Sequence, residues 1–189
     1  MAKNTSTRKL VDKLPNLKAA IANMTKKAAF VGVPSETTNI RSEFNEGAVN
    51  NASLAYIHQN GSPAKNIPAR PFMTIGIEAA KKAVDEQLKK AAKKNLDLNN
   101  KGGVSDLTAG LKLAGQIAEN KIKEAINSSI DPQLSEATLR ARARRGRKGA
   151  KAELLSRAAG NAPSTANART LVNTGALRNS IKYVIREDK

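Results

Sequence analysis

The sequence predicts an α+β fold in which a small mixed or antiparallel sheet packs against two long helices. Residues 71–94 and 107–125 each repeat apolar side chains at the helical spacing. Residues 29–33 are apolar and partly β-branched, and residues 181–186 alternate apolar with basic side chains, which predicts two strands. Aromatic residues make up only 3% of the chain, so the core must depend on aliphatic side chains and many alanines, which favour helices.

The composition limits the class of protein. With 189 residues the chain can bury one core, so we expect a single domain over residues 1–189. The absence of Cys excludes disulfides, Cys-ligated metals and thiol nucleophiles. No apolar run is long enough to cross a bilayer, so we expect no membrane partner. The formal net charge of +17 predicts a polyanionic or acidic neighbour, or serves solubility.

The chain begins with a basic stretch that no apolar segment follows, so we expect no secretory signal. Apolar residues then recur at the helical spacing from Leu10 to Ala28. Pro15 interrupts this pattern, which predicts either a kink or a helix that begins near Leu14. Residues 1–13 are therefore expected to form an N-terminal arm.

A strand and a loop follow. Residues 29–33 predict a buried strand that Pro34 stops, because proline cannot donate to a strand ladder. Residues 35–50 are polar without a sustained period, so we expect a flexible loop.

The two long helices should form an antiparallel pair. The first runs from Pro71 to Lys94, and an Asn- and Gly-rich segment at residues 95–103 ends it. Ser105 or Asp106 is expected to cap the second helix. Their similar lengths and short connection favour antiparallel packing through alanine-rich faces.

The last third combines a basic region with a terminal strand. Ser135 predicts the cap of a short basic helix over residues 136–145. Residues 146–168 are poorly patterned, so we expect residues 140–168 to be a flexible basic insertion. Thr174–Gly175 then predicts a turn before a short helical segment and the final strand.

A proline-stiffened loop links the middle of the chain to the first long helix. Asn60–Gly61 should end a short apolar helix, and the three prolines that follow fix φ and remove backbone donors. Arg70 lies between two restrained positions, so its side chain should point in a defined direction. We therefore interpret Pro68, Arg70 and Pro71 as a docking loop. Phe72 is expected to anchor the helix start in the core.

Four segments of the chain carry motifs that occur together, in this order, in one family of proteins. The central one is Ala-Tyr-Ile-His-x-x-Gly-Ser-x-x-x-x-Ile-Pro-x-Arg-Pro-Phe-Met over residues 55–73. The second is Thr-Gly-x-Leu-x-x-Ser-Ile-x-Tyr over residues 174–183. Weaker matches lie at residues 30–34 and 134–139. In their order the four segments resemble the neck and tail-completion proteins of long-tailed bacteriophages and prophages. The long basic segment between Thr138 and Leu171 departs from that family's pattern.

The resemblance implies a structural virion protein without enzymatic activity. Such proteins join head to tail as minor tail components, assembled in the host cytoplasm, and form rings around the DNA channel between the connector or adaptor and the tail terminator or tail tube. A hexameric ring is favoured over a dodecamer. The resemblance places subunit and partner contacts at Pro68, Arg70, Pro71, Phe72, Thr174, Gly175 and Leu177.

A dense run of positive charge is the strongest electrostatic feature of the sequence. It could be a solvated arm, or it could contact DNA phosphates or an acidic neighbour. Because almost no aromatic residues accompany it, any DNA contact should avoid base stacking and be independent of sequence. A sequence-independent DNA-binding protein is therefore the alternative function. The run consists of Arg140, Arg142, Arg144, Arg145, Arg147, Lys148 and Lys151.

The sequence contains no recognisable catalytic or cofactor constellation. His58 is the single histidine, and no nucleophile-elbow pattern accompanies it. We interpret it as a residue of a helix C-terminus that interacts with unpaired carbonyl groups. The Gly-rich segments lack the Lys-Ser/Thr of a phosphate loop. We therefore expect no enzyme, no metal and no cofactor.

Overall fold

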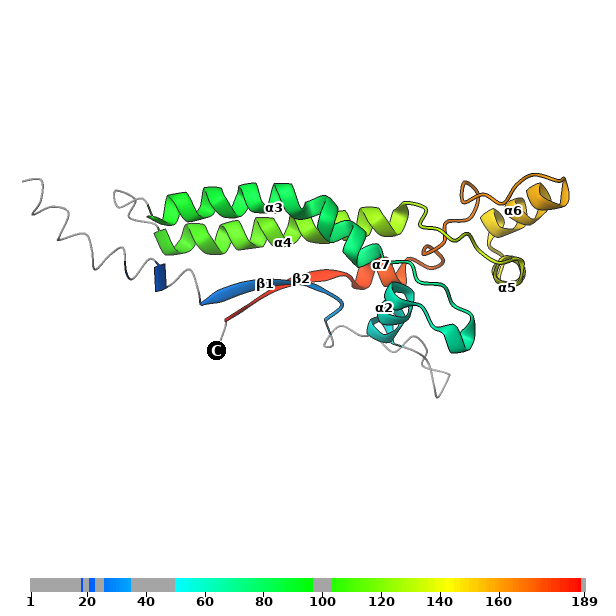
Figure 1. Cartoon of the computed structure of the whole chain (residues 1–189), viewed down its shortest axis with the longest axis horizontal. Helices are drawn as coiled ribbons and strands as arrows, with labels where there is room; N and C mark the ends of the chain where they lie inside the picture. The colour runs from blue at the N-terminus through cyan, green and yellow to red at the C-terminus, as the bar shows by residue number, and fades with distance from the viewer. Residues whose placement is uncertain (1–17, 19–20, 23–25, 35–49, 97–102, 188–189) are drawn as a thin grey trace, which may run out of the picture. The chain divides into compact units, whose positions relative to one another are not determined.

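The computed structural model describes residues 18, 21–22, 26–34, 50–96 and 103–187 (Figure 1). Within these residues the chain has six α-helices, one short 3-10 helix and a two-stranded antiparallel sheet, which confirms the predicted α+β class with two long helices. The expected arm at residues 1–13 and the expected loop, apart from Asn50, lie outside the described residues, as does most of the helix expected near Leu14.

The elements follow one another along the chain as labelled in Figure 1. They are β1 (Lys27–Gly32), α2 (Asn51–Asn60), the 3-10 helix η2 (Pro63–Lys65), α3 (Phe72–Leu96), α4 (Gly103–Asn127), α5 (Glu136–Arg144), α6 (Lys148–Ala158), α7 (Ala176–Ser180) and β2 (Lys182–Glu187).

The contacts within the chain group it into two compact units. Unit 1 is formed by the described residues of 1–31, 80–118 and 183–189, and unit 2 by those of 32–79 and 119–182. The expectation of one domain over residues 1–189 stays a prediction.

Unit 1 joins the two strands to parts of α3 and α4. Gly110 of α4 faces Ala91 of α3 so closely that a Cβ atom at Gly110 would overlap the Ala91 methyl group. A Cβ atom at Gly115 of α4 would lie 2.8 Å from the Tyr183 ring of β2. Small residues on α4 therefore let both α3 and the sheet approach its backbone.

Unit 2 has its own apolar core. Phe72, Ile122, Ile126, Leu139 and Ile181 are its largest fully buried apolar side chains. The α5 helix packs against α6, and α2 packs against α7. Burial of such side chains is the main favourable term in folding, so these contacts hold the short helices in place.

Three sequence-based expectations need correction. The first strand was expected to be buried, but the residues of β1 are half-buried or exposed, and Phe30 is 53% exposed. The α4 helix begins at Gly103, so Ser105 and Asp106 lie in its first turn and neither is the residue before the helix. Residues 146–168 were expected to lack regular structure, but α6 forms within them. The short basic helix that Ser135 was expected to cap is confirmed, because Ser135 Oγ accepts a hydrogen bond from the Thr138 N–H at 3.3 Å.

A buried carboxylate explains why α6 forms in a segment with little apolar patterning. Glu153 is fully buried, and its side-chain oxygens accept hydrogen bonds from Arg157 Nε at 2.9 Å, the Ser164 N–H at 2.7 Å and Asn167 Nδ2 at 3.2 Å. These bonds tie α6 to the segment that follows it. Local spacing in the sequence does not reveal such a tertiary connection.

Candidate functional site

The proline-stiffened loop folds back onto the end of α2. Gly61 adopts φ +79°, which ends the helix as the sequence predicted. Ser62 and Ile67 form an isolated antiparallel bridge. The Arg70 N–H then donates to the His58 carbonyl oxygen at 2.6 Å. His58 lies in the last turn of α2, the place predicted for it, and one free carbonyl of that turn is satisfied by the loop.

The α2 helix also caps the start of α3. Gln59 Oε1 accepts a hydrogen bond from the Met73 N–H at 3.0 Å, and Gln59 Nε2 donates to Thr74 Oγ1 at 2.8 Å. The first N–H groups of a helix have no partner within the helix, so a side chain from another element can satisfy them. Reasoning from sequence missed this role, because Gln59 lies at a variable position of the motif.

Arg70 has the defined direction that the sequence predicted, but it points into unit 2. Its Nε and Nη2 donate to the Pro132 carbonyl oxygen at 3.1 and 2.6 Å, and the residue is only 5% exposed. Burial lowers the pKa of this guanidinium. Arg70 therefore holds the loop onto the segment before α5.

The C-terminal motif forms the turn and helix that were predicted. Gly175 adopts φ +80° immediately before α7, and the Ala176 N–H donates to Thr174 Oγ1 at 3.3 Å. Leu177 is buried. A pocket of about 200 Å³ lies where α2, α5 and this turn meet, and its lining includes His58, Arg145 and Thr174.

The residues expected to face a partner therefore fall into two groups. Arg70, Phe72 and Leu177 are buried inside unit 2, so their side chains stabilise this unit and are not available for a neighbour in this conformation. Pro68 and Thr174 are exposed, and Pro71 and Gly175 are half-buried. The candidate partner surface narrows to these four residues.

The basic run also divides in two. Arg140 pairs with Glu136 at 2.5 Å on the surface of α5. Arg142 donates to the carbonyl oxygens of Arg169, Thr170 and Val172 at 2.8, 2.9 and 3.2 Å. Arg142 thus fastens α5 to the segment after α6, and its contact with DNA or an acidic partner stays a prediction.

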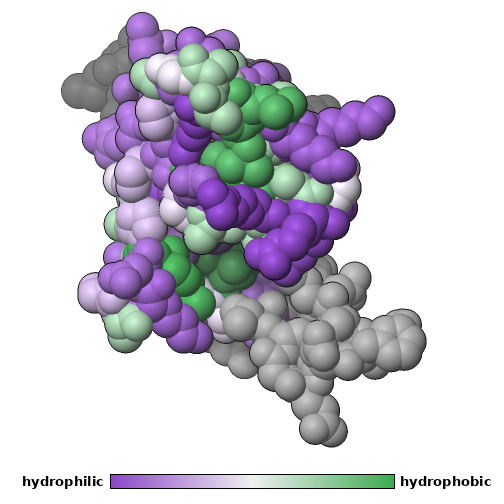
Figure 2. All heavy atoms as spheres, turned by 90° about the vertical axis from the view of Figure 1, so that its right-hand side faces the viewer, coloured by the Kyte–Doolittle hydropathy of each residue, from purple (hydrophilic) through white to green (hydrophobic). Residues whose placement is uncertain are grey.

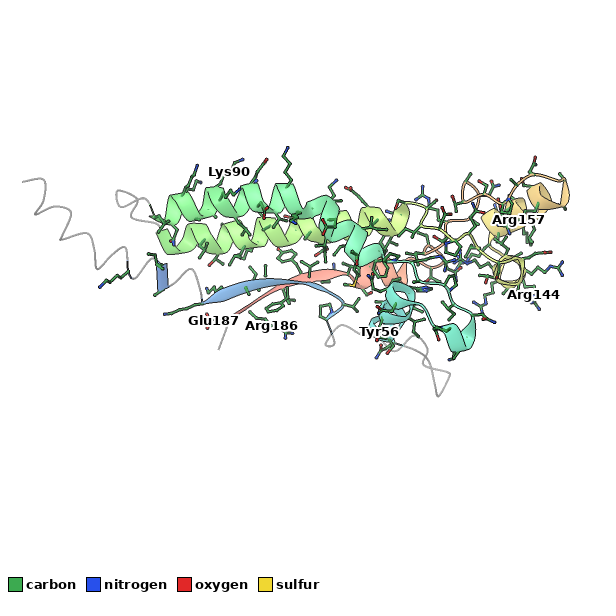
Figure 3. The ribbon with its side chains drawn as sticks, viewed as in Figure 1. Tyr56, Lys90, Arg144, Arg157, Arg186 and Glu187 are labelled. Carbon is green, nitrogen blue, oxygen red and sulfur yellow. The ribbon has the colours of Figure 1, made fainter. Side chains whose placement is uncertain are left out.

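The other members of the run are exposed and form no ion pair among the described residues. We name them the basic surface: Arg144, Arg145, Arg147, Lys148 and Lys151. Figure 3 shows Arg144 on α5 pointing away from the helix, in contrast to Arg157 on α6, which pairs with Glu153. Figure 2, viewed from the side on which Figure 1 draws α5 and α6, shows long hydrophilic side chains projecting between small apolar patches.

A second pocket, of about 340 Å³, opens beside the basic surface. Four cationic residues line it, namely Arg142, Arg147, Lys148 and Arg169. Arg169 was missed by the sequence reasoning because it lies far along the chain from the basic run. The pocket lining contains no acidic residue.

In the part of the chain that the structure describes, no group of three or more His, Asp or Glu residues could hold a metal ion. None of the described helices is both long and apolar enough to span a bilayer.

Comparison with protein families, curated proteins and solved structures finds no match to this chain.

Proposed function

We propose that the chain is a structural virion protein of the phage neck or tail top, without enzymatic activity and without a cofactor. It would join head to tail as a ring around the DNA channel, between the connector or adaptor and the tail terminator or tail tube. The proposal comes from the resemblance of residues 55–73 and 174–183 to tail-completion proteins.

One observation supports the proposal beyond the motifs themselves. The two matching segments are separated by about 100 residues, yet α2 packs against α7, and one pocket is lined by Leu54 and His58 together with Thr174 and Leu177. Two motifs that belong to one functional module are expected to meet in space, whereas two accidental matches have no reason to do so.

Ring assembly follows from the same proposal. Identical subunits in a closed ring make heterologous contacts, so each subunit needs two different surfaces. The exposed Pro68 loop and the Thr174 turn provide one candidate surface in unit 2. A hexamer is favoured because six subunits would match the symmetry of a tail, and a dodecamer would match a connector.

The test is made in the phage or prophage that encodes the chain. A stop codon in its gene should leave separate heads and tails in electron micrographs of the lysate, and the wild-type chain supplied in trans should restore joined virions. Peptide mass spectrometry of purified virions should detect the chain. Normal virions from the stop-codon phage, or virions without density for the chain at the neck, would refute the proposal.

Substitutions at the candidate partner surface sharpen this test. Pro68→Asp and Thr174→Lys alter exposed side chains, and the second also removes the hydrogen bond from the Ala176 N–H. Circular dichroism checks that both variants stay folded, and both should fail to restore joined virions. Lys90→Gln is the matched control, because Lys90 is exposed on α3 in unit 1 and should restore them fully (Figure 3). Full rescue by both variants would show that Pro68 and Thr174 do not contribute to the interface.

The second candidate function is sequence-independent DNA binding. The observation that favours it is the basic surface, whose five cations have no acidic partner among the described residues. This function predicts tight, salt-dependent binding of duplex DNA by the isolated chain. The virion proposal predicts weak binding by the isolated chain and incorporation into particles.

A further inference from the structure

We propose that the 340 Å³ pocket between α5, the first turn of α6 and residues 166–173 binds one phosphate group of a nucleic-acid backbone. We call it the phosphate pocket. The inference deepens the second candidate function, because it names the groups that would hold DNA. It does not depend on a place in a virion.

The first argument is uncompensated charge. Arg147, Lys148 and Arg169 line the phosphate pocket and form no ion pair among the described residues. The fourth cation, Arg142, is half-buried and donates only to uncharged carbonyl groups. Burial lowers the pKa of Arg142, and the nearby positive charges of Arg70 and Arg147 lower it further. An anion in the pocket would relieve this repulsion.

The second argument is the backbone geometry at the start of α6. Arg147 is the N-cap residue and provides no side-chain cap, while its carbonyl accepts the first helical hydrogen bond, from the Lys151 N–H at 3.2 Å. The N–H groups of residues 148–150 precede that bond, so they lack helical partners. All three residues line the pocket. N–H groups without a partner in the helix and the helix dipole both favour a phosphate at this position.

A glycine brings the two walls of the phosphate pocket together. The Asn167 carbonyl oxygen lies so close to Gly149 that any side chain there would overlap it. Because Gly149 has no side chain, the segment that carries Arg169 can approach the first turn of α6. The pocket is thus formed by two segments held at close range.

An unsatisfied side chain also points to a ligand. Asn173 lines both the phosphate pocket and the 200 Å³ pocket, and its Oδ1 atom is buried without a hydrogen-bond partner among the described residues. Buried polar atoms normally have a partner in the protein or in bound water or ligand. A half-turn of the Asn173 amide would exchange this acceptor for the Nδ2 donor, from which a phosphate oxygen could accept.

The surroundings favour a polyanion over a single small anion. Arg144 of α5, Arg145 directly after it and Lys151 of α6 are also exposed, so a chain of phosphates that occupied the pocket could meet further cations. Phosphate contacts carry no sequence information, in agreement with the lack of aromatic residues for base stacking. An acidic protein segment would offer carboxylates, which use fewer of the converging donors.

The test measures binding of a short fluorescein-labelled DNA duplex to the full chain by anisotropy, over a range of about 50 to 200 mM NaCl. The pocket variant is Arg147→Gln/Lys148→Gln/Arg169→Gln. The matched control is Lys82→Gln/Lys89→Gln/Lys90→Gln, which removes the same charge from exposed positions of α3. Circular dichroism checks that both variants keep the helical content of the wild type.

The expected result is a change in the salt dependence. Each phosphate contact contributes about 0.9 to the slope of log K against log salt, so the pocket variant should lose about 0.9 and the control variant much less. A loss of about 2.7 would mean three separate contacts with no shared phosphate, and would overturn the pocket. Equal losses of slope in the pocket variant and the control variant would also overturn the phosphate pocket. The second candidate function would then still stand, because the wild type would bind DNA. No duplex binding by the wild type at low salt would overturn the pocket together with the second candidate function.

A second measurement locates the ligand independently of the variants. The backbone amide NMR signals of Gly149 and Ala150 should shift when the duplex is added to the wild-type chain, and should shift less when poly-glutamate is added at equal charge. Unchanged signals in the presence of bound duplex, or a larger shift with poly-glutamate, would overturn the proposal.

Discussion

At the scale of single residues, charged side chains stabilise unit 2 by connecting its segments through hydrogen bonds. Arg70, Arg142 and Glu153 each connect segments that are distant in sequence, and each does so through several hydrogen bonds. Hydrogen bonds to charged groups contribute about 1.5–3 kcal/mol each, more than neutral ones. A basic chain with few aromatic residues can use such bonds where other proteins use larger apolar side chains.

Glu153 should make stability depend on pH in the acid range. Burial alone would raise the pKa of its carboxyl, but the hydrogen bonds from Ser164, Arg157 and Asn167 and the charge of Arg157 outweigh burial and hold the pKa below its ordinary value of 4.5. As the pH falls, Glu153 therefore binds a proton at a higher pH in the unfolded chain than in the folded chain. This stabilisation is present above pH 4.5 and is lost as the pH falls below it.

The variant Glu153→Gln isolates this contribution. At pH 7 it should lower the free energy of unfolding by about 2 kcal/mol, since a charged partner of Arg157 is removed. Its stability should also fall less steeply than that of the wild type below pH 4.5. Urea unfolding followed by circular dichroism at several pH values measures both effects. Glu136→Gln is the matched control, because its pair with Arg140 is exposed and should change stability by less than about 1 kcal/mol. Equal effects of the two substitutions would contradict the role of Glu153.

Arg70 offers a second test at this scale. Arg70→Lys keeps the charge but loses the paired donation from Nε and Nη2 to the Pro132 carbonyl, so the free energy of unfolding should fall by about 1–3 kcal/mol. Arg144→Lys, at an exposed position of α5, should leave it unchanged. Urea unfolding midpoints compare the two variants. An unchanged midpoint for Arg70→Lys would show that the paired donation to the Pro132 carbonyl does not contribute to stability.

At the scale of elements, close approach of backbones decides how α3 meets α4. A Cβ atom at Gly76 of α3 would lie 2.5 Å from the Ile122 Cα atom of α4, closer than real contacts allow. The near atom belongs to the backbone, so a side-chain rotation cannot relieve the overlap. The pair of helices therefore depends on glycine at this position.

In the variant Gly76→Ala, helix propensity and overlap with α4 change stability in opposite directions. Helix propensity alone would stabilise the variant by about 1 kcal/mol. Overlap with α4 should cost about 1–3 kcal/mol, and we expect it to win, so the thermal midpoint should fall. Ala79→Gly, at an exposed position of the same helix, calibrates the propensity effect. A higher midpoint for Gly76→Ala would mean that α4 moves away at little cost.

The elements show which features a sequence reveals and which it hides. The long helices, both strands and α7 were predictable because apolar spacing and turn residues are local signals. The α6 helix was not, because it is stabilised by hydrogen bonds that Glu153 accepts from Ser164 and Asn167. The basic run was visible, but the sequence could not separate Arg142, which binds carbonyl groups, from Arg147, which lines a pocket with the distant Arg169.

At the scale of the whole molecule, net charge should govern association between copies. A formal charge of +17 makes identical chains repel one another, and salt screens such repulsion beyond about 8 Å at physiological ionic strength. If copies form the proposed ring, self-association should increase as NaCl is raised. Sedimentation velocity of the isolated chain at low and high NaCl measures this. Association that weakens with salt would indicate attraction between opposite charges, against the expectation from composition.

The turn after α6 has a practical consequence. Gly160 adopts φ +86°, nothing lies within 4 Å of the position a Cβ atom would take there, and residues 158–163 are exposed. A short epitope spliced after Asn161 should therefore leave the fold intact. Antibody labelling of such a tagged chain would offer a direct way to find its location in an assembled particle.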